Sequence, residues 1–226
     1  MKLVLLDVDM TLISARGAGM ASLDAAMSDL FGIERGFEGI EFAGRTDRLI
    51  VEDGLSANGL APSEGLVSRV REAYIRNLAG RLSSGWPATV LGGVNELLDL
   101  LSRREDACFG LLTGNWKEGA FLKLAACGID RYFRFGAFAE CGRVRRELIP
   151  HALGMAEALC GRRFDPSDTW IVGDTPHDVA CGRDWNLRTL GVATGPYDVE
   201  ALEACGADAV LEDLSSTDTV ERTIFG

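Results

Sequence analysis

The stretch that decides the fold of this 226-residue chain is Leu3-Val4-Leu5-Leu6-Asp7-Val8-Asp9-Met10-Thr11. Residues 3–6 are apolar without alternation, which is typical of a parallel strand that is covered on both faces. Asp7 and Asp9 follow where this strand should end, and residues two apart in an extended backbone point the same way. Because ligand sites of open parallel sheets lie at the carboxyl ends of the strands, the stretch predicts an acidic site at the edge of an α/β sheet.

Further apolar runs indicate more strands, and segments with helical periodicity separate them. The apolar runs lie at residues 107–112, 133–138, 169–172, 189–192 and 209–211. The helical segments between them lie at residues 96–102, 117–127 and 148–159. This alternation predicts βαβ units and a parallel sheet.

The stretch from about residue 15 to residue 86 interrupts the alternation. It has the pattern of three helices, at residues 22–31, 46–58 and 63–82, and it contains no convincing buried strand. We therefore expect a helical insert at residues 16–86 and an α/β core made of residues 1–15 and 87–226. Two segments rich in Gly, Ser and Pro, at residues 15–19 and 83–87, would connect the two parts.

Net charge, cysteine spacing and the lack of long apolar runs argue against several classes of protein. The chain has 23 Lys and Arg against 34 Asp and Glu, a net charge of -11, which disfavours a nucleic-acid-binding surface. Its six cysteines form no CxxC pair and no zinc spacing, so we expect reduced thiols. The N-terminus becomes acidic too soon for a signal peptide, and no apolar run approaches the ~20 residues of a membrane span. We expect a cytoplasmic protein with no membrane partner.

Three further polar segments follow predicted strands, so the sheet could bring them to the same edge as Asp7 and Asp9. They are Thr113-Gly114-Asn115, the arginine-rich segment 143–146 and the acidic segment 174–178. Phosphoryl transfer requires a nucleophile, neutralisation of charge and positioning. A carboxylate can act as the nucleophile, and the Thr113 hydroxyl with the N–H groups of Gly114 and Asn115 can cradle a phosphate. An arginine can neutralise phosphoryl oxygens, and the acids suit Mg²⁺.

With these residues the chain resembles the haloacid dehalogenase-like hydrolase superfamily. Four motifs are matched in order: DVDMT, the Thr of LLTGN, a basic residue near 143–146, and GDTPHD. The resemblance covers nearly the whole chain and is closest to phosphoglycolate-phosphatase-like members with a helical cap after the first motif. It implies a Rossmann-like three-layer core with a parallel sheet plus an inserted α-helical cap domain.

The resemblance also implies residue roles. Asp7 would be the nucleophile and Asp9 the general acid/base. Mg²⁺ would be held by the Asp7 carboxylate, the Asp9 carbonyl and Asp174. Asp178 would complete the metal site by orienting metal-bound water or the neighbouring basic residue. Arg45 lies in a cap loop that, in this family, faces the active site and helps to choose the substrate.

Two positions depart from the family pattern. The third motif is usually one Lys or Arg, whereas three arginines compete here; the context of residues 145–150 favours Arg145, with Arg143 next. Met10 stands where Gly is common, and we expect a differently tuned turn with little effect on chemistry.

The second acid narrows the expected reaction. An alkoxide leaving group benefits from protonation and a halide does not, so Asp9 favours phosphate esters as substrates. The sequence thus predicts a Mg²⁺-dependent phosphatase acting on a small phosphorylated metabolite through an aspartyl phosphate. A mutase like β-phosphoglucomutase and a catalytically silent binding protein remain open, as do the identity of the ester and the choice between monomer and homodimer.

Overall fold

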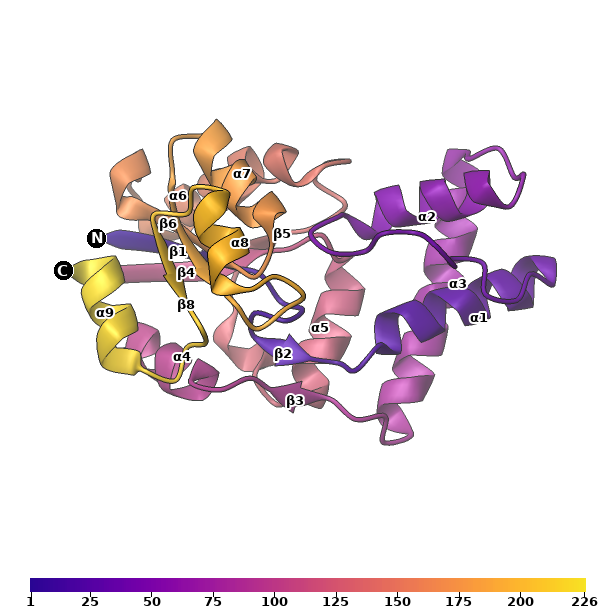
Figure 1. Cartoon of the computed structure of the whole chain (residues 1–226), viewed down its shortest axis with the longest axis horizontal. Coiled ribbons are helices and arrows are strands. Elements are labelled where there is room, and N and C mark those ends of the chain that lie inside the picture. Colours follow the sequence, from indigo (N-terminus) through magenta and orange to yellow (C-terminus); the bar gives the residue numbers. More distant parts are fainter.

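The computed structural model describes residues 1–226, and its centre is a sheet of six parallel strands in the order β5-β4-β1-β6-β7-β8 (Figure 1). The strands are β1 (Lys2–Leu6), β4 (Ala107–Leu112), β5 (Gly136–Ala137), β6 (Thr169–Gly173), β7 (Arg188–Val192) and β8 (Ala209–Leu211). The first strand pairs with β4 on one side and β6 on the other. The predicted parallel sheet is confirmed, with the first strand at its centre.

Side chains of β1 alternate between two hydrophobic cores, one on each face of the sheet. Val4 and Leu6 belong to a core of 22 buried residues, and Leu3 and Leu5 to a second core of 13. The first core is covered by α4 (Val94–Arg103), α5 (Lys117–Ala126) and α9 (Thr217–Phe225). The second is covered by α6 (Ile149–Cys160) and α7 (Pro176–Asp184), while α8 (Val199–Ala204) packs on β7 and β8. Helices on both faces confirm the predicted three-layer core.

Three helices lie between β1 and β4 in the sequence and pack together at one end of the molecule, away from the two termini (Figure 1). They are α1 (Ala18–Phe31), α2 (Asp47–Ala57) and α3 (Glu64–Ser83). The side chains of Thr46 and Ser63 accept main-chain N–H groups and so fix the starts of α2 and α3. The helices supply most of a separate cluster of 16 buried residues, to which Trp116 and Ala139 from the sheet-bearing part also belong. The three predicted helices are confirmed.

A short antiparallel ribbon joins these helices to the sheet-bearing part. It pairs β2 (Ile13–Ser14) with β3 (Thr89–Val90). Strands of two residues leave no periodic signal in a sequence, so the ribbon was not predicted. It holds the chain together where it leaves for the helices and where it returns.

Two details of the predicted elements are wrong. Most of the run 133–138 is not a strand: only Gly136–Ala137 pairs with β4, and Asp130–Tyr132 forms a 3₁₀ turn before it. Three phenylalanines give this run its strand-like composition: Phe133 and Phe138 are buried in the first core, and Phe135 packs against the second. The first helix begins at Ala18, four residues earlier than predicted. No helix of the structure is both long and apolar enough to cross a membrane.

Candidate active site

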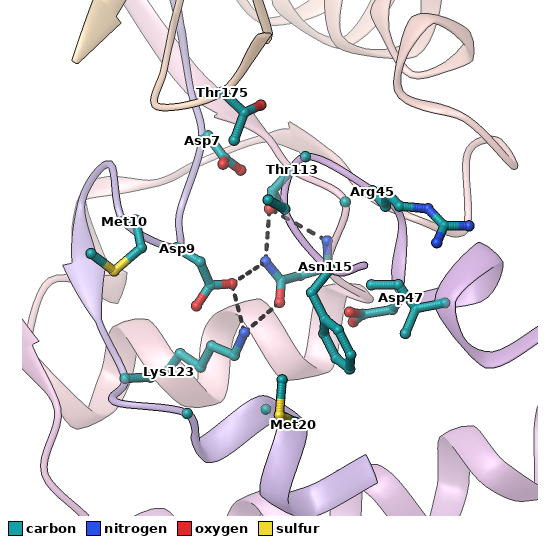
Figure 2. Close-up of a pocket in the computed structure, with 18 of the residues that line it drawn as sticks. Asp7, Asp9, Met10, Met20, Arg45, Asp47, Thr113, Asn115, Lys123 and Thr175 are labelled. Atoms are coloured by element: carbon teal, nitrogen blue, oxygen red, sulfur yellow. Dashed lines mark hydrogen bonds and ion pairs between the residues drawn. The ribbon is translucent and has the colours of Figure 1, made fainter. Parts of the chain in front are cut away.

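The carboxyl ends of the central strands meet at one cavity of about 370 Å³, part of whose lining Figure 2 shows. Eight of the nine predicted site residues line it, all but Asp178: Asp7, Asp9, Arg45, Thr113, Gly114, Asn115, Arg145 and Asp174. Asp7 directly follows β1, and its N–H donates to the carbonyl of Val172 at 3.0 Å. Asp174 directly follows β6 and Thr113 directly follows β4. The sheet therefore brings together acids that lie 167 residues apart in the sequence, Asp7 and Asp174.

A tight turn after Asp7 directs Asp9 into the cavity. The Leu12 N–H donates to the Val8 carbonyl at 3.0 Å, and the Met10 N–H donates to the Ile13 carbonyl at 2.7 Å. Met10 has a φ of 57°, in the left-handed region that favours glycine. Met10 is therefore strained in a conformation that glycine would adopt freely, which agrees with the expectation of a differently tuned turn.

Arg145 is the arginine of segment 143–146 that reaches the acids. Its Nη2 lies 3.1 Å from Asp7 Oδ1 and donates to the Leu112 carbonyl at 3.1 Å, and it is also paired with Asp178. By contrast, Arg143 pairs with Glu52 at 2.6 Å, and Arg146 is exposed. The geometry therefore separates the three arginines that the sequence left in competition.

Asp178 has partners for both carboxylate oxygens. Its Oδ2 accepts the Thr175 hydroxyl at 2.7 Å and the Thr175 N–H at 3.2 Å, which caps the start of α7. Its Oδ1 pairs with Arg145. Of the two roles that the resemblance implied for Asp178, orientation of the basic residue is the one that these contacts favour.

The acids around Asp7 carry a charge that the protein does not balance. One oxygen from each of Asp7, Asp174 and Asp178 lies within 4.8 Å of the others, and all three residues are buried. Burial raises the pKa of Asp7 to about 6, partly offset by Arg145. Burial, with Asp7 and Asp178 nearby, raises the pKa of Asp174 to about 8. Three buried carboxylates beside one guanidinium fit a divalent cation with oxygen ligands.

The loop Thr113-Gly114-Asn115 packs directly on the helical insert. The Gly114 carbonyl accepts the Asp47 N–H at 2.7 Å, and a Cβ at Gly114 would lie 2.1 Å from the Arg45 carbonyl oxygen. The Asp47 carboxylate in turn accepts the Trp116 N–H at 2.8 Å. Only glycine fits at this contact, because any larger residue would push the insert away.

Arg45 lines the cavity, but its guanidinium is directed elsewhere. It pairs with Asp53 at 2.5 Å and donates to the Glu41 carbonyl at 3.0 Å. Figure 2 shows the side chain pointing away from Asp9 and Lys123. The loop that carries Arg45 therefore reaches the site through its backbone.

Sequence reasoning missed two residues of the site, Lys123 and Asp47. Lys123 Nζ lies 2.6 Å from Asp9 Oδ2 and 2.7 Å from Asn115 Oδ1. Burial alone would lower the pKa of Lys123, but Asp9 and Asp47 outweigh it and raise this pKa. Burial raises the pKa of Asp47 to about 7, although Lys123 opposes the shift. The available signal was a lone lysine on the stripe of α5 that also carries Ala120 and Leu124.

Comparisons with known proteins agree with this geometry. A family model described as HAD-hydrolase-like matches residues 147–217. Pyrophosphatase PpaX of Bacillus velezensis is 28% identical over 123 residues, which are 54% of this chain and 55% of that protein. The chain thus spans about half the length of the curated relatives it matches.

Solved structures share the fold over the whole chain. A hydrolase from Pseudomonas syringae has a TM-score of 0.73 and 19% identity, with all of both chains covered. A predicted phosphoglycolate phosphatase from Haemophilus somnus has a TM-score of 0.69 and 16% identity over 97% of both chains. The match of residues 147–217 to this family model and the fold shared with these structures agree with the resemblance to the haloacid dehalogenase-like hydrolase superfamily seen in the sequence.

Proposed function

We propose that the protein is a Mg²⁺-dependent phosphatase that hydrolyses a small phosphate monoester through a phosphoryl group carried on Asp7. The observation that carries the proposal is the meeting of Asp7, Asp9, Thr113 and Arg145 around one cavity at the carboxyl ends of the strands. A nucleophile, an acid/base and donors for phosphoryl oxygens are the components that phosphoryl transfer requires.

In the proposed reaction an oxygen of Asp7 attacks phosphorus while the ester oxygen leaves. Arg145, held by Asp178, offsets charge on the phosphoryl oxygens, and the Thr113 hydroxyl with the N–H groups of Gly114 and Asn115 binds them. Asp9 gives a proton to the leaving oxygen. Water then attacks phosphorus, gives its proton to Asp9 and releases phosphate from Asp7. The side chains of this chain thus complete both halves of the hydrolysis.

The residues that would hold Mg²⁺ are the Asp7 and Asp174 carboxylates, the Asp9 carbonyl and, at the edge of the group, Asp178. The raised pKa values of Asp7, about 6, and Asp174, about 8, support this assignment, because burial first and neighbouring carboxylates second disfavour their charged forms, and a bound cation would offset both effects. A bound Mg²⁺ would supply the positive charge that lets an anionic nucleophile approach an anionic phosphate.

We further propose that residues 16–86 act as a cap domain over a core of residues 1–15 and 87–226. Residues of the insert line the same cavity as the acids, among them Leu23, Phe42, Ile50 and Tyr74. Such a cover would exclude water and select the leaving group, and the cavity volume of about 370 Å³ suits a compact metabolite. The loop that carries Arg45 would contribute to that selection.

A screen of phosphate release tests the proposal. Wild-type protein is incubated with Mg²⁺ and a panel of phosphorylated acids, sugar phosphates, alkyl phosphates and pyrophosphate, with Asp7→Asn as the matched control. We expect Mg²⁺-dependent release from at least one ester and none from Asp7→Asn. Turnover by Asp7→Asn at the wild-type rate would refute the role of Asp7. Interconversion of sugar phosphate isomers without phosphate release would favour the mutase, and inactivity on the whole panel would favour the silent binding protein.

A further inference from the structure

Lys123 is the least expected component of the site, because its ammonium group is buried against the general acid/base. Only 6% of its side chain is exposed. The start of α1 lies close by, since a Cβ added at Gly19 would be 3.6 Å from Lys123 Nζ. Nζ donates to Asp9 Oδ2 at 2.6 Å and to Asn115 Oδ1 at 2.7 Å, as the dashed lines in Figure 2 show. Hydrogen bonds to charged groups strengthen when water is excluded, so both contacts are firm.

The ammonium group decides which way the Asn115 amide faces. A lysine ammonium has donors and no acceptor, so the atom that it meets on Asn115 must be the oxygen. The amide nitrogen then donates to Asp9 Oδ2 at 2.8 Å and to Thr113 Oγ1 at 2.8 Å. The opposite orientation would set the amide oxygen against a carboxylate and its N–H groups against an ammonium group. The lysine therefore excludes it.

This orientation leaves the Thr113 hydroxyl free to donate into the cavity. Thr113 Oγ1 accepts from the Asn115 amide nitrogen at 2.8 Å and lies 3.4 Å from the Asn115 N–H. Both contacts use oxygen lone pairs, and the hydroxyl proton has no acceptor within the protein. It is available to an acceptor placed in the cavity, such as a phosphoryl oxygen.

The same ammonium group fixes one oxygen of Asp9 and leaves the other open. The Lys123 and Asn115 donors both reach Oδ2, whereas Oδ1 makes no hydrogen bond with the protein. The Asp9 side chain is 41% exposed, so its open oxygen belongs to the half of the carboxylate that a ligand can reach. A carboxylate anchored on one side in this way cannot rotate without losing two hydrogen bonds.

We infer that Lys123 is a positioning residue that orients both the Asp9 carboxylate and, through Asn115, the Thr113 hydroxyl toward the substrate. The inference rests on the proposed phosphatase function. It assigns to α5 a role in catalysis that none of the four sequence motifs contains. Substrate would contact Asp9 and Thr113 and not Lys123 itself.

Kinetics of three lysine variants on two esters test this inference. The variants are Lys123→Met, Lys123→Arg and the control Lys117→Met, which changes an exposed lysine at the start of the same helix. We expect Lys123→Met to lower kcat on an alkyl phosphate by about 10²-fold, the size of effect that misplaced groups produce. The loss on p-nitrophenyl phosphate should be smaller, because its leaving group departs without a proton from Asp9. Lys123→Arg should recover part of the loss, and Lys117→Met should match wild type.

An activity-independent measurement separates failure of this inference from failure of the proposed function. The side-chain amide of Asn115, identified in ¹H–¹⁵N NMR spectra by its loss in Asn115→Asp, should exchange slowly in wild type and at least tenfold faster in Lys123→Met. If wild type hydrolyses no ester, the proposed function is wrong and the amide exchange still decides the positioning role. Wild-type kcat in Lys123→Met, equal losses on both esters, or unchanged amide exchange would each overturn the inference. Should Lys123→Met fail to fold, Lys123→Gln is measured in the same way.

Discussion

Replacement of Asp47 by Asn should remove a large part of the pH dependence of folding. Asp47, the first residue of α2, is buried where the insert meets the start of α5. Burial raises its pKa from 3.8 to about 7. A carboxyl group with a higher pKa in the folded state binds its proton more tightly there than in the unfolded chain. Its contribution to stability is therefore present at acidic pH and is lost as the pH rises toward 7.

The magnitude of this loss follows from the shift. Each pH unit between the unfolded and folded pKa values costs about 1.36 kcal/mol, so wild type should lose about 2.7 kcal/mol more than Asp47→Asn between pH 5 and pH 8. An asparagine keeps a carbonyl oxygen to accept the Trp116 N–H, so the variant removes charge with little change in shape.

Urea unfolding of wild type and Asp47→Asn provides the measurement. The fluorescence of the chain's four tryptophans is followed at pH 5, 6, 7 and 8 in EDTA, so that no metal shifts the balance of the other acids. Glu72→Gln, which changes an exposed acid on α3, is the control and should follow wild type. Parallel stability curves for wild type and Asp47→Asn would refute the reasoning, because Asp47 would then have an ordinary pKa in the folded protein.

Three further outcomes follow from the same structure. Met10→Gly should raise the free energy of unfolding by about 1 kcal/mol, because glycine adopts a φ of 57° without strain; a lower urea midpoint would contradict this. Mg²⁺ at 100 times its Kd should stabilise wild type against thermal unfolding by about 2.7 kcal/mol, and Asp174→Asn should lose most of this gain. An equal gain in wild type and in Asp174→Asn would exclude Asp174 as a ligand. Arg45→Ala should cost less than about 1 kcal/mol of stability, since it breaks a partly exposed ion pair with Asp53. In steady-state assays of ester hydrolysis it should change KM more than kcat. A larger change in kcat than in KM would place Arg45 at the reacting atoms.

The core of this fold could be predicted from sequence because its signals are local and redundant. Except for β5, the parallel strands are short apolar runs, and polar residues that favour a turn follow β1 and β6, as in Leu6-Asp7 and Gly173-Asp174. The run 133–138 misled because aromatic residues that anchor a loop in the core have the same composition as a strand. The β2–β3 ribbon gave no signal because pairing over two residues is decided by tertiary contacts.

The residues of the candidate site could be predicted only where the residue type and its position after an apolar run indicate a chemical role. Acids and a threonine after apolar runs do so, and the structure brings them together around one cavity. Lys123 and Asp47 do not, because a lysine within a helix and an acid at a helix start are usually solvated. Their burial depends on how α5 faces the insert, which is a long-range property. The same kind of contact distinguishes Arg145 from Arg143 and Arg146, because Arg145 is the one that approaches Asp7.

The hydrogen bonds that join Asp47 to Gly114 and Trp116 limit how freely the insert could be exchanged for that of another protein of this fold. The insert gives Gly114 a donor and Trp116 an acceptor, and the Arg45 carbonyl fills the space that a Cβ at Gly114 would occupy. A chimera carrying a foreign insert would have to supply an acid at the first position of α2 and a carbonyl at the same place. Without them the graft would loosen the loop Thr113-Gly114-Asn115. Under the proposed function, exchange of the insert would therefore alter both the cover of the cavity and the loop that receives the phosphoryl group.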